Sequence, residues 1–319
     1  MSRGALLFCA FFAAGAWLQN APRHTIAGRV VGSDGRVPSK VELSVSESTG
    51  PGASSSRPVA VAADGSFRTP PLLPGSYVLH TGRGPVSPDS DSEGGLAVVA
   101  VGSADVTGVS IRTRRYALRG KYVMRGGDPA AKWPSHIHVL AMLVAGGAPS
   151  VSVTADGAPN GEFILRNAFG PRILRPGYAL EGSRWWFGGV LLDGVDVTDV
   201  PTDFSAKPDA KLEVVFTQHP AVIEGTVTTA SGEPAAGAWI VEMSANPALW
   251  QTTTYKFQTG RDGRFSHRTK PGRYLLAALP ATPYQVKPIL GDLSVLAARA
   301  TPVTAVERER AVVQLRLPR

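Results

Sequence analysis

The sequence predicts an all-β protein made of three tandem β-sandwich domains behind an N-terminal signal peptide. Three observations support this fold class. A turn-strand-turn-strand pattern occurs three times, the 319 residues include 35 glycines and 26 prolines between runs rich in Val, Thr and Leu, and no amphipathic helix exceeds a turn or two. The hydrophobic fraction of 43% supports folded cores, and the charged fraction of 18% is too low for a disordered chain.

The repeated pattern is clearest in the stretch Asp262–Phe265, which is followed by Pro271–Tyr274. Asp-Gly supplies the positive φ that a tight turn needs. We expect Phe265 and Tyr274 to point into a sandwich core, because aromatic residues favour half-buried strands. The earlier copies are Asp64–Phe67 with Pro74–Tyr77, and a degraded copy, Asn160–Phe163 with Gly170–Ile173.

Residues 1–21 have the pattern of a signal peptide and a short linker. Arg3 precedes an apolar run, Gly4–Ala16, that is too short to span a bilayer and ends in a small-x-small cleavage site after Ala16. The alternative is an N-terminal anchor that is not cleaved. Cleavage would remove Cys9, the only cysteine, so the mature chain would have neither a disulfide nor a transmembrane span. We therefore expect a secreted, periplasmic or envelope-associated protein.

Basic residues give the chain a formal net charge of +8. An exported protein rarely meets nucleic acid, so we expect none, and anionic lipid head groups, acidic polysaccharide or other envelope proteins are the partners that such a field suggests. The alternative is that these charges sit on solvated strand faces and protect sheet edges. The basic clusters are Arg112, Arg114, Arg115, Arg119 and Lys121, and Arg308, Arg310, Arg316 and Arg319.

Each domain is defined by alternating apolar and polar runs bounded by turn residues. The first sandwich, residues 22–113, has predicted strands at 25–31, 41–45, 59–61, 77–79 and 106–112, with a polar loop over 82–95. The second, 114–218, has strands at 116–123, 135–143, 163–165, 185–192 and 212–216. The third, 219–319, has strands at 223–227, 239–243 and 312–317, with two more that begin at Phe265 and Tyr274.

The third domain resembles the carboxypeptidase regulatory-like domain. The residues that carry this resemblance are Gly225, Val227, Pro234, Gly237, Ala238, Asp262, Gly263, Phe265, Pro271, Gly272 and Tyr274. The first domain matches at Gly28, Val30, Asp64, Gly65, Phe67, Pro74, Gly75 and Tyr77 but lacks the Pro-x-x-Gly-Ala segment, and the middle domain lacks Pro-Gly-x-Tyr. The stretch 194–199 with Asp203-Phe204 is similar to one in secreted multi-copy bacterial proteins of this family. The resemblance implies transthyretin-like or immunoglobulin-like sandwiches, a class that includes carbohydrate-binding-like folds, and its turn motifs specify fold rather than function.

His136 and His138 are the most metal-like pair. At strand spacing the two side chains lie on one face and could bind one ion. The sequence places no third ligand, and the alternative is two partly exposed polar positions. The His-x-x-Glu motif of the carboxypeptidase catalytic domain is absent, as are a Gly-x-Ser-x-Gly elbow and a phosphate loop.

Asp89, Asp91 and Glu93 resemble the opening of a calcium loop, with Gly94 at the sixth position. The bidentate acid expected at position twelve is missing, because Ala100 stands there. The alternative is a solvated acidic loop.

Trp185 and Trp186 form the richest aromatic spot. Neighbours on a strand face opposite sides, so one ring is expected in the core and the other outside. An outward ring could stack on a sugar face. Alternatively, it covers a neighbouring domain.

The function that these observations favour is a non-catalytic modular protein, without cofactor, that binds or spaces something at the cell envelope. A carbohydrate-binding module using Trp185 or Trp186 is the first alternative. A metal-dependent hydrolase using His136 and His138 is the second.

Overall fold

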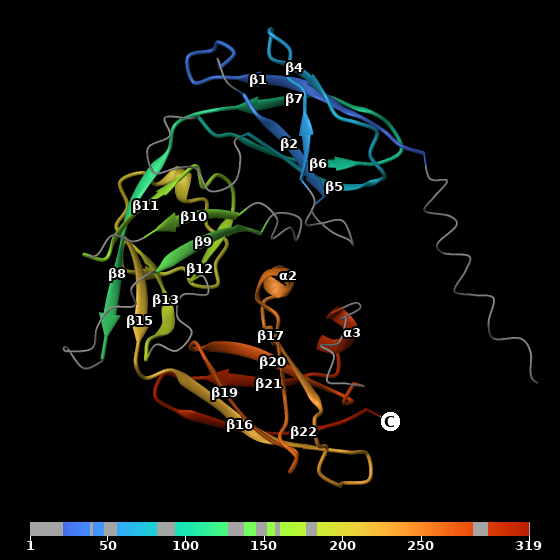
Figure 1. The fold of residues 1–319 in the computed structure, drawn as a ribbon, viewed down its shortest axis with the longest axis vertical. Coiled ribbons are helices and arrows are strands. Elements are labelled where there is room, and N and C mark those ends of the chain that lie inside the picture. Colours follow the sequence, from blue (N-terminus) through green and yellow to red (C-terminus); the bar gives the residue numbers. More distant parts are fainter. Residues whose placement is uncertain are drawn as a thin grey trace, which may run out of the picture. The chain divides into compact units, whose positions relative to one another are not determined.

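The computed structural model describes residues 22–38, 41–47, 56–81, 93–126, 137–144, 152–156, 160–176, 184–282 and 293–318 (Figure 1). In these ranges the chain forms six β-sheets with a few short helices, so the predicted all-β sandwich class is confirmed. The predicted signal peptide lies outside the described residues. None of the described helices is long and apolar enough to cross a membrane.

The first sandwich packs a sheet of order β4-β1-β7 against one of order β3-β2-β5-β6. Ile26, Val45, Phe67 and Tyr77 lie in its core. The strands are β1 (Ile26–Val31), β2 (Leu43–Glu47), β3 (Ser56–Val59), β4 (Ser66–Arg68), β5 (Gly75–Thr81), β6 (Leu96–Val101) and β7 (Val106–Arg112).

The second sandwich combines the sheet β10-β9-β12 with the sheet β11-β8-β15-β13-β14. Tyr122 stacks on Phe163 with ring centroids 4.8 Å apart and meets Phe216 edge-on, which places aromatic rings in its interior. The elements are β8 (Ala117–Arg125), β9 (His138–Leu143), β10 (Ser152–Asp156), β11 (Glu162–Arg166), β12 (Arg172–Pro176), β13 (Trp186–Leu192), β14 (Val195–Asp196), the 3-10 helix η3 (Phe204–Ala206) and β15 (Leu212–Thr217).

The third sandwich packs the sheet β19-β16-β22 on the sheet β18-β17-β20-β21. The second of these sheets is covered on its outer face too, where Leu293 and Leu296 of α3 pack with Val241 and Met243. Every residue of β17 is therefore buried. The elements are β16 (Ala221–Thr228), β17 (Trp239–Ser244), η4 (Pro247–Leu249), α2 (Trp250–Thr253), β18 (Tyr255–Gln258), β19 (Arg264–Thr269), β20 (Gly272–Leu279), α3 (Leu293–Ala297), β21 (Thr301–Ala305) and β22 (Arg310–Arg316).

The repeated turns have the geometry that the sequence predicts. Gly65, Gly161 and Gly263 have φ of 83°, 82° and 71°, a region that disfavours side chains. The residue before each glycine closes the turn, because the side-chain oxygen of Asp64, Asn160 or Asp262 accepts a hydrogen bond from the backbone N–H two residues later.

The Pro-Gly-x-Tyr motif fixes a second corner. The Tyr77 hydroxyl donates to the Leu73 carbonyl, and the Tyr274 hydroxyl donates to the Lys270 carbonyl, each at 2.9 Å. Both rings are buried in their cores, as predicted. In the middle sandwich, Arg172 bonds to a nearby backbone carbonyl instead, that of Phe169 at 2.9 Å.

In each sandwich the last strand lies parallel to the first, as β7 with β1, β15 with β8 and β22 with β16. Each described sheet takes its strands from one predicted domain range. The chain divides into two compact units, Met1–Arg83 with Asp91–Arg115, and Gly84–Ser90 with Tyr116–Arg319. The second and third sandwiches thus share one unit, and the domain boundary predicted at 218/219 stays a prediction.

Candidate functional site: the junction of the second and third sandwiches

Asp199 joins two basic side chains that come from different sandwiches. Its Oδ1 accepts a hydrogen bond from an Arg175 terminal nitrogen at 2.6 Å, and its Oδ2 accepts one from Lys270 Nζ at 2.5 Å. Arg175 lies on β12 of the second sandwich, and Lys270 lies between β19 and β20 of the third. The side chains of Arg175 and Lys270 are only 6% and 11% exposed, so water screens the two ion pairs little.

The second sandwich holds Arg175 and Asp199, its part of this ion-pair network, in a fixed position. Arg175 also donates to the carbonyls of Leu174 and Thr198, and its guanidinium lies 5.6 Å from the centroid of Phe187. The turn that carries Asp199 is closed by Asp196, which accepts hydrogen bonds from the backbone N–H and the hydroxyl of Thr198. The carboxylate of Asp199 is therefore presented by a preorganised turn.

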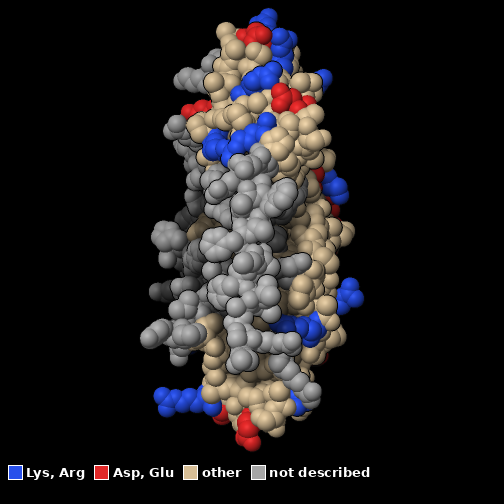
Figure 2. All heavy atoms as spheres, turned by 90° about the vertical axis from the view of Figure 1, so that its right-hand side faces the viewer, with Lys and Arg blue, Asp and Glu red and all other residues tan. Residues whose placement is uncertain are grey.

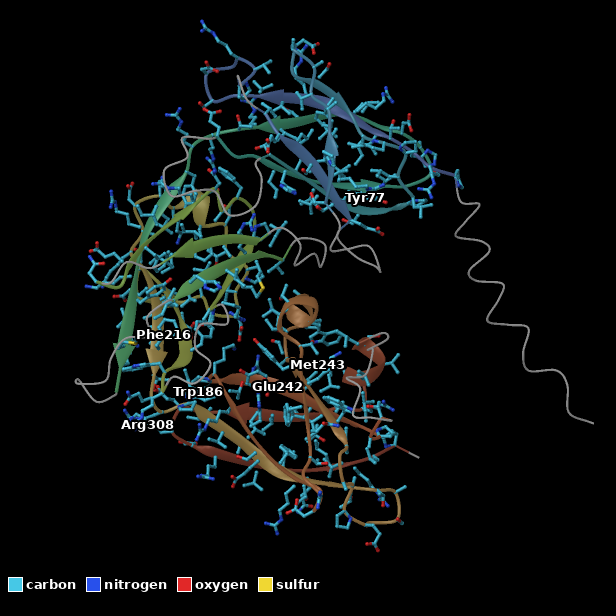
Figure 3. The ribbon with its side chains drawn as sticks, in the orientation of Figure 1. Tyr77, Trp186, Phe216, Glu242, Met243 and Arg308 are labelled. Carbon is cyan, nitrogen blue, oxygen red and sulfur yellow. The ribbon has the colours of Figure 1, made fainter. Side chains whose placement is uncertain are left out.

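The third sandwich continues the network inward to Glu242, which is fully buried on β17. Thr269 Oγ1 lies 3.1 Å from Glu242 Oε1 and 3.2 Å from the Tyr274 hydroxyl, which itself bonds to the Lys270 backbone. Glu242 Oε2 has no hydrogen-bond partner among the described residues, and His267 Nε2 is 3.6 Å away. Glu242 points toward the sandwich interior, away from the face on which Met243 packs (Figure 3).

Burial decides the protonation of this cluster. It raises the pKa of Glu242 to about 7, although the Thr269 hydrogen bond and the Lys270 charge act against it. Burial also lowers the pKa of His267 to about 4. Between these two values both groups are neutral, so their contact is not an ion pair. The pKa of Lys270 is lowered mainly by burial, with Asp199 opposing the shift, and burial raises the pKa of Tyr274.

Two further contacts connect the second and third sandwiches. Thr217 at the end of β15 donates to Glu307 at 2.7 Å, and the Arg268 guanidinium lies 5.4 Å from the ring centroid of Trp186. Figure 3 labels Trp186 and Arg308 in this region. The junction thus combines buried ion pairs, a hydrogen bond to a carboxyl group and a cation–π contact.

The predicted aromatic site lies at the same junction. Trp185 is 5% exposed, and Trp186 is half-buried beside Arg268. The two neighbouring rings therefore occupy different environments. Sugar binding by either ring stays a prediction.

The predicted metal residues are only partly described. His136, Asp89 and Asp91 lie outside the described residues, and His138 is half-buried on β9. Glu93 has a structural role in the first sandwich, where its carboxylate accepts from the hydroxyls of Ser33 at 2.7 Å and Thr113 at 2.6 Å. These bonds lower its pKa. Within the described ranges, no group of three or more His, Cys, Asp or Glu side chains is arranged to hold a metal ion.

The basic side chains that the structure describes do not gather into one patch on the face that Figure 2 draws. On the face drawn in Figure 2, Lys and Arg side chains occur in separate groups, several with Asp or Glu beside them. The exposed ion pairs Arg29–Asp64, Arg68–Asp105 and Arg310–Glu224 have the same character. Such pairs contribute little to stability.

Sequence motifs did not reveal the residues of the junction. Arg175, Glu242, His267 and Lys270 belong to no motif, and Asp199 lies in the 194–199 stretch noted only for its resemblance. One signal was present, because Glu242 is the single charged residue in the apolar run Trp239–Ser244. A charge in a buried strand is expensive and marks a polar network.

Comparisons with known proteins identify no family. No known protein family matches the sequence, and no curated protein matches it significantly. Solved structures match the chain only at low similarity. The Bacillus anthracis TIE protein is 13% identical with a TM-score of 0.23, covering 92% of this chain and 50% of its own, so the chain spans about half the length of that structure.

Two more solved structures have similar statistics. The streptococcal ancillary pilin is 14% identical with a TM-score of 0.27, over 93% of this chain and 100% of its own. Two B repeat units of the collagen-binding protein of Staphylococcus aureus are 10% identical with a TM-score of 0.20, over 80% of this chain and 68% of theirs. At this level the comparison supports no conclusion about the ligand or activity of this chain.

Proposed function

We propose that the chain is an exported, non-catalytic, modular β-sandwich protein that acts as a spacer or binding module at the cell envelope. The observation that carries the proposal is the ion-pair network of Arg175, Asp199 and Lys270, which connects two sandwiches within one compact unit. A spacer needs modules of fixed relative orientation. Flexible connections are the usual alternative between domains with small interfaces.

The export part of the proposal is supported by the N-terminal pattern. The only cysteine lies within the apolar run that would be removed, so the mature sandwiches depend on their cores alone. We also propose that the third sandwich is a carboxypeptidase regulatory-like domain. Support for this comes from the motif residues, since Asp262, Gly263 and Pro271 lie in the turns on either side of β19 and Gly272 begins β20.

Two measurements test the proposal. N-terminal sequencing of the exported chain is expected to begin at Trp17, and a mature chain that retains Met1 would contradict export with cleavage. ¹⁵N relaxation is expected to give one rotational correlation time for the second and third sandwiches. Asp199→Asn should separate their tumbling, whereas Asp209→Asn, at an exposed turn of the second sandwich, should not.

The non-catalytic part needs its own experiment. A panel of peptides, esters and glycosides, with added zinc and calcium, is expected to show no turnover above background. Turnover that disappears in His136→Ala or His138→Ala would favour the hydrolase instead. A glycan array on the mature chain, with Trp186→Ala as the comparison, tests the sugar-binding alternative.

A further inference from the structure

The outer edge of β22 is a long, regular strand edge that nothing described covers. β22 pairs in parallel with β16 over seven consecutive residues without a register shift. It ends its sheet, so among the described residues no strand pairs with its other side (Figure 1). β22 and β7 are the longest edge strands of the described sheets. Exposed edges of this kind can accept another chain.

Three of the other edge strands, β7, β3 and β21, have irregularities that β22 lacks. β7 carries a register shift opposite Ile26 and Gly28, with Gly108 at φ 76°. Pro58 and Pro302 interrupt β3 and β21. Bulges and prolines are common protections of sheet edges. β22 contains neither, and at its centre Val312 is 74% exposed, the most exposed of the large hydrophobic residues described.

The second sandwich shows what such an edge can accept. Its last strand, β15, is parallel to β8 just as β22 is parallel to β16. On its other side, β15 pairs with β13 in antiparallel register, from Trp186 opposite Thr217 to Leu192 opposite Leu212. The position filled by β13 in the second sandwich is thus open beside β22 in the third.

The backbone groups available at this edge follow from the hydrogen bonds to β16. Leu317 N donates to Thr228 O, and Glu309 O accepts from Val222 N. The backbone N–H and C=O groups of the odd-numbered residues of β22 therefore point toward β16. Because bonding groups alternate sides along a strand, the N–H and C=O of Val312 and Gln314 point away from β16. They are the groups that an added strand would engage.

Side chains along the edge define the partner. The solvent-facing side carries Arg310, Val312, Gln314 and Arg316, and the opposite side carries the buried Val313 and Leu315. Glu224 pairs with Arg310, which is still 68% exposed, and Arg316 donates to the Ala230 carbonyl. A complementary strand would be apolar on one side and acidic at both ends of the other.

A second copy of β22 does not meet this requirement. In antiparallel self-pairing with Val313 opposite Val313, Arg310 of each copy would lie opposite Arg316 of the other. Directly opposed like charges destabilise strand pairs.

We propose that the β22 edge binds, by antiparallel strand addition, an extended segment of another polypeptide that alternates apolar residues with a side bearing an acidic residue at each end. This inference names the partner class of the proposed binding module and rests on that function. Its test needs only the purified full chain, so its failure would leave the export and tumbling experiments unaffected.

The probe is a capped heptapeptide, Glu-Val-Thr-Val-Thr-Val-Glu, compared with the same peptide carrying Lys at both ends. Hydrogen exchange resolved by residue is expected to show new protection of the Val312 and Gln314 amides with the acidic peptide. The Lys peptide should bind at least about tenfold more weakly, a difference of about 1.4 kcal/mol. Protection at another edge, or none at all, would overturn the proposal.

Two sets of variants locate the interaction. Val312→Pro removes an outward N–H without removing a bond to β16, so the acidic peptide should no longer protect the Gln314 amide from exchange. Val312→Thr keeps this N–H and should bind the peptide normally. Should the proline variant fail to fold, the double variant Arg310→Glu with Arg316→Glu serves instead. It should prefer the Lys peptide, and unchanged preference would contradict the assigned partner. Concentration-dependent dimerisation through β22 would contradict it as well.

Discussion

Phe67 lies directly opposite Gly28 in the antiparallel pairing of β1 with β4, and its ring fills the space that a side chain at position 28 would need. A Cβ there would lie 3.0 Å from Phe67 Cζ and 1.9 Å from the backbone oxygen of Val109. The same cross-strand pair recurs as Gly120 with Phe163 and Gly225 with Phe265. An aromatic ring over a strand glycine therefore defines the repeat as clearly as its turns do.

Replacing this glycine is expected to destabilise its sandwich. Gly28→Ala should lower the free energy of unfolding of the first sandwich by about 1–3 kcal/mol, because β7 and the Phe67 ring must both move. Gly102→Ala is the matched control, since a Cβ at position 102 meets nothing within 4 Å. Urea denaturation of both variants checks the prediction, and equal effects would contradict it.

The turns give a second prediction. Gly263→Val places a β-branched residue at φ 71°, with its Cβ 2.8 Å from Val227 O. The expected loss is about 1–3 kcal/mol in the third sandwich. Hydrogen exchange during denaturation should show the first sandwich unchanged. Simultaneous loss of protection in all three sandwiches would contradict separate cores.

Much of the fold could be predicted because turns and alternation are local signals. Asp262-Gly263 sets a positive φ without help from the rest of the chain, and Val312–Leu317 alternates enough to define a strand. Strands β6, β10, β14, β18 and β21 were not predicted, and β12 was indicated only by the degraded copy of the motif at Gly170–Ile173. Arg172 and Arg175 weaken the strand signal of β12, because charged residues are typical of exposed segments, although both side chains are buried.

The junction could not be predicted for a different physical reason. Asp199 and Lys270 are 71 residues apart, and only the packing of two sandwiches brings them together. Their types are ordinary for surface turns. Local patterns carry no information on such pairs, whereas the isolated Glu242 in an apolar strand carried a partial signal.

The third prediction concerns the ion pair itself. Asp199→Asn should destabilise the unit of the second and third sandwiches, because Arg175 and Lys270 would remain largely buried without a full countercharge. A double-mutant cycle with Lys270→Met should give a coupling energy of about 0.5–3 kcal/mol. Thermal denaturation with Asp209→Asn as the control measures it. Strictly additive effects would mean that the contact contributes nothing.

The last prediction uses the opposite pKa shifts of Glu242 and His267. The folded pKa of Glu242, about 7, is above its ordinary value of 4.5, so its contribution to stability is present below pH 4.5 and is lost as pH rises toward 7. The folded pKa of His267, about 4, is below 6.5, so its contribution is present above pH 6.5 and is lost as pH falls toward 4. Over the shared window of 4.5–6.5 the two effects oppose each other.

The native chain should therefore show a nearly flat contribution from this pair between pH 4.5 and 6.5, and each single variant should expose one slope. Glu242→Gln, which keeps an acceptor for Thr269, should gain stability as pH rises from 4 to 6.5. His267→Gln should lose stability as pH rises from 4.5 to 7. The free energy of unfolding should change by about 3 kcal/mol over each window. Denaturant melts at half-unit pH steps, referred at each pH to the double variant that lacks both groups, Glu242→Gln with His267→Gln, measure both slopes. Parallel profiles for the two variants would show that the buried carboxyl and imidazole do not titrate as their burial requires.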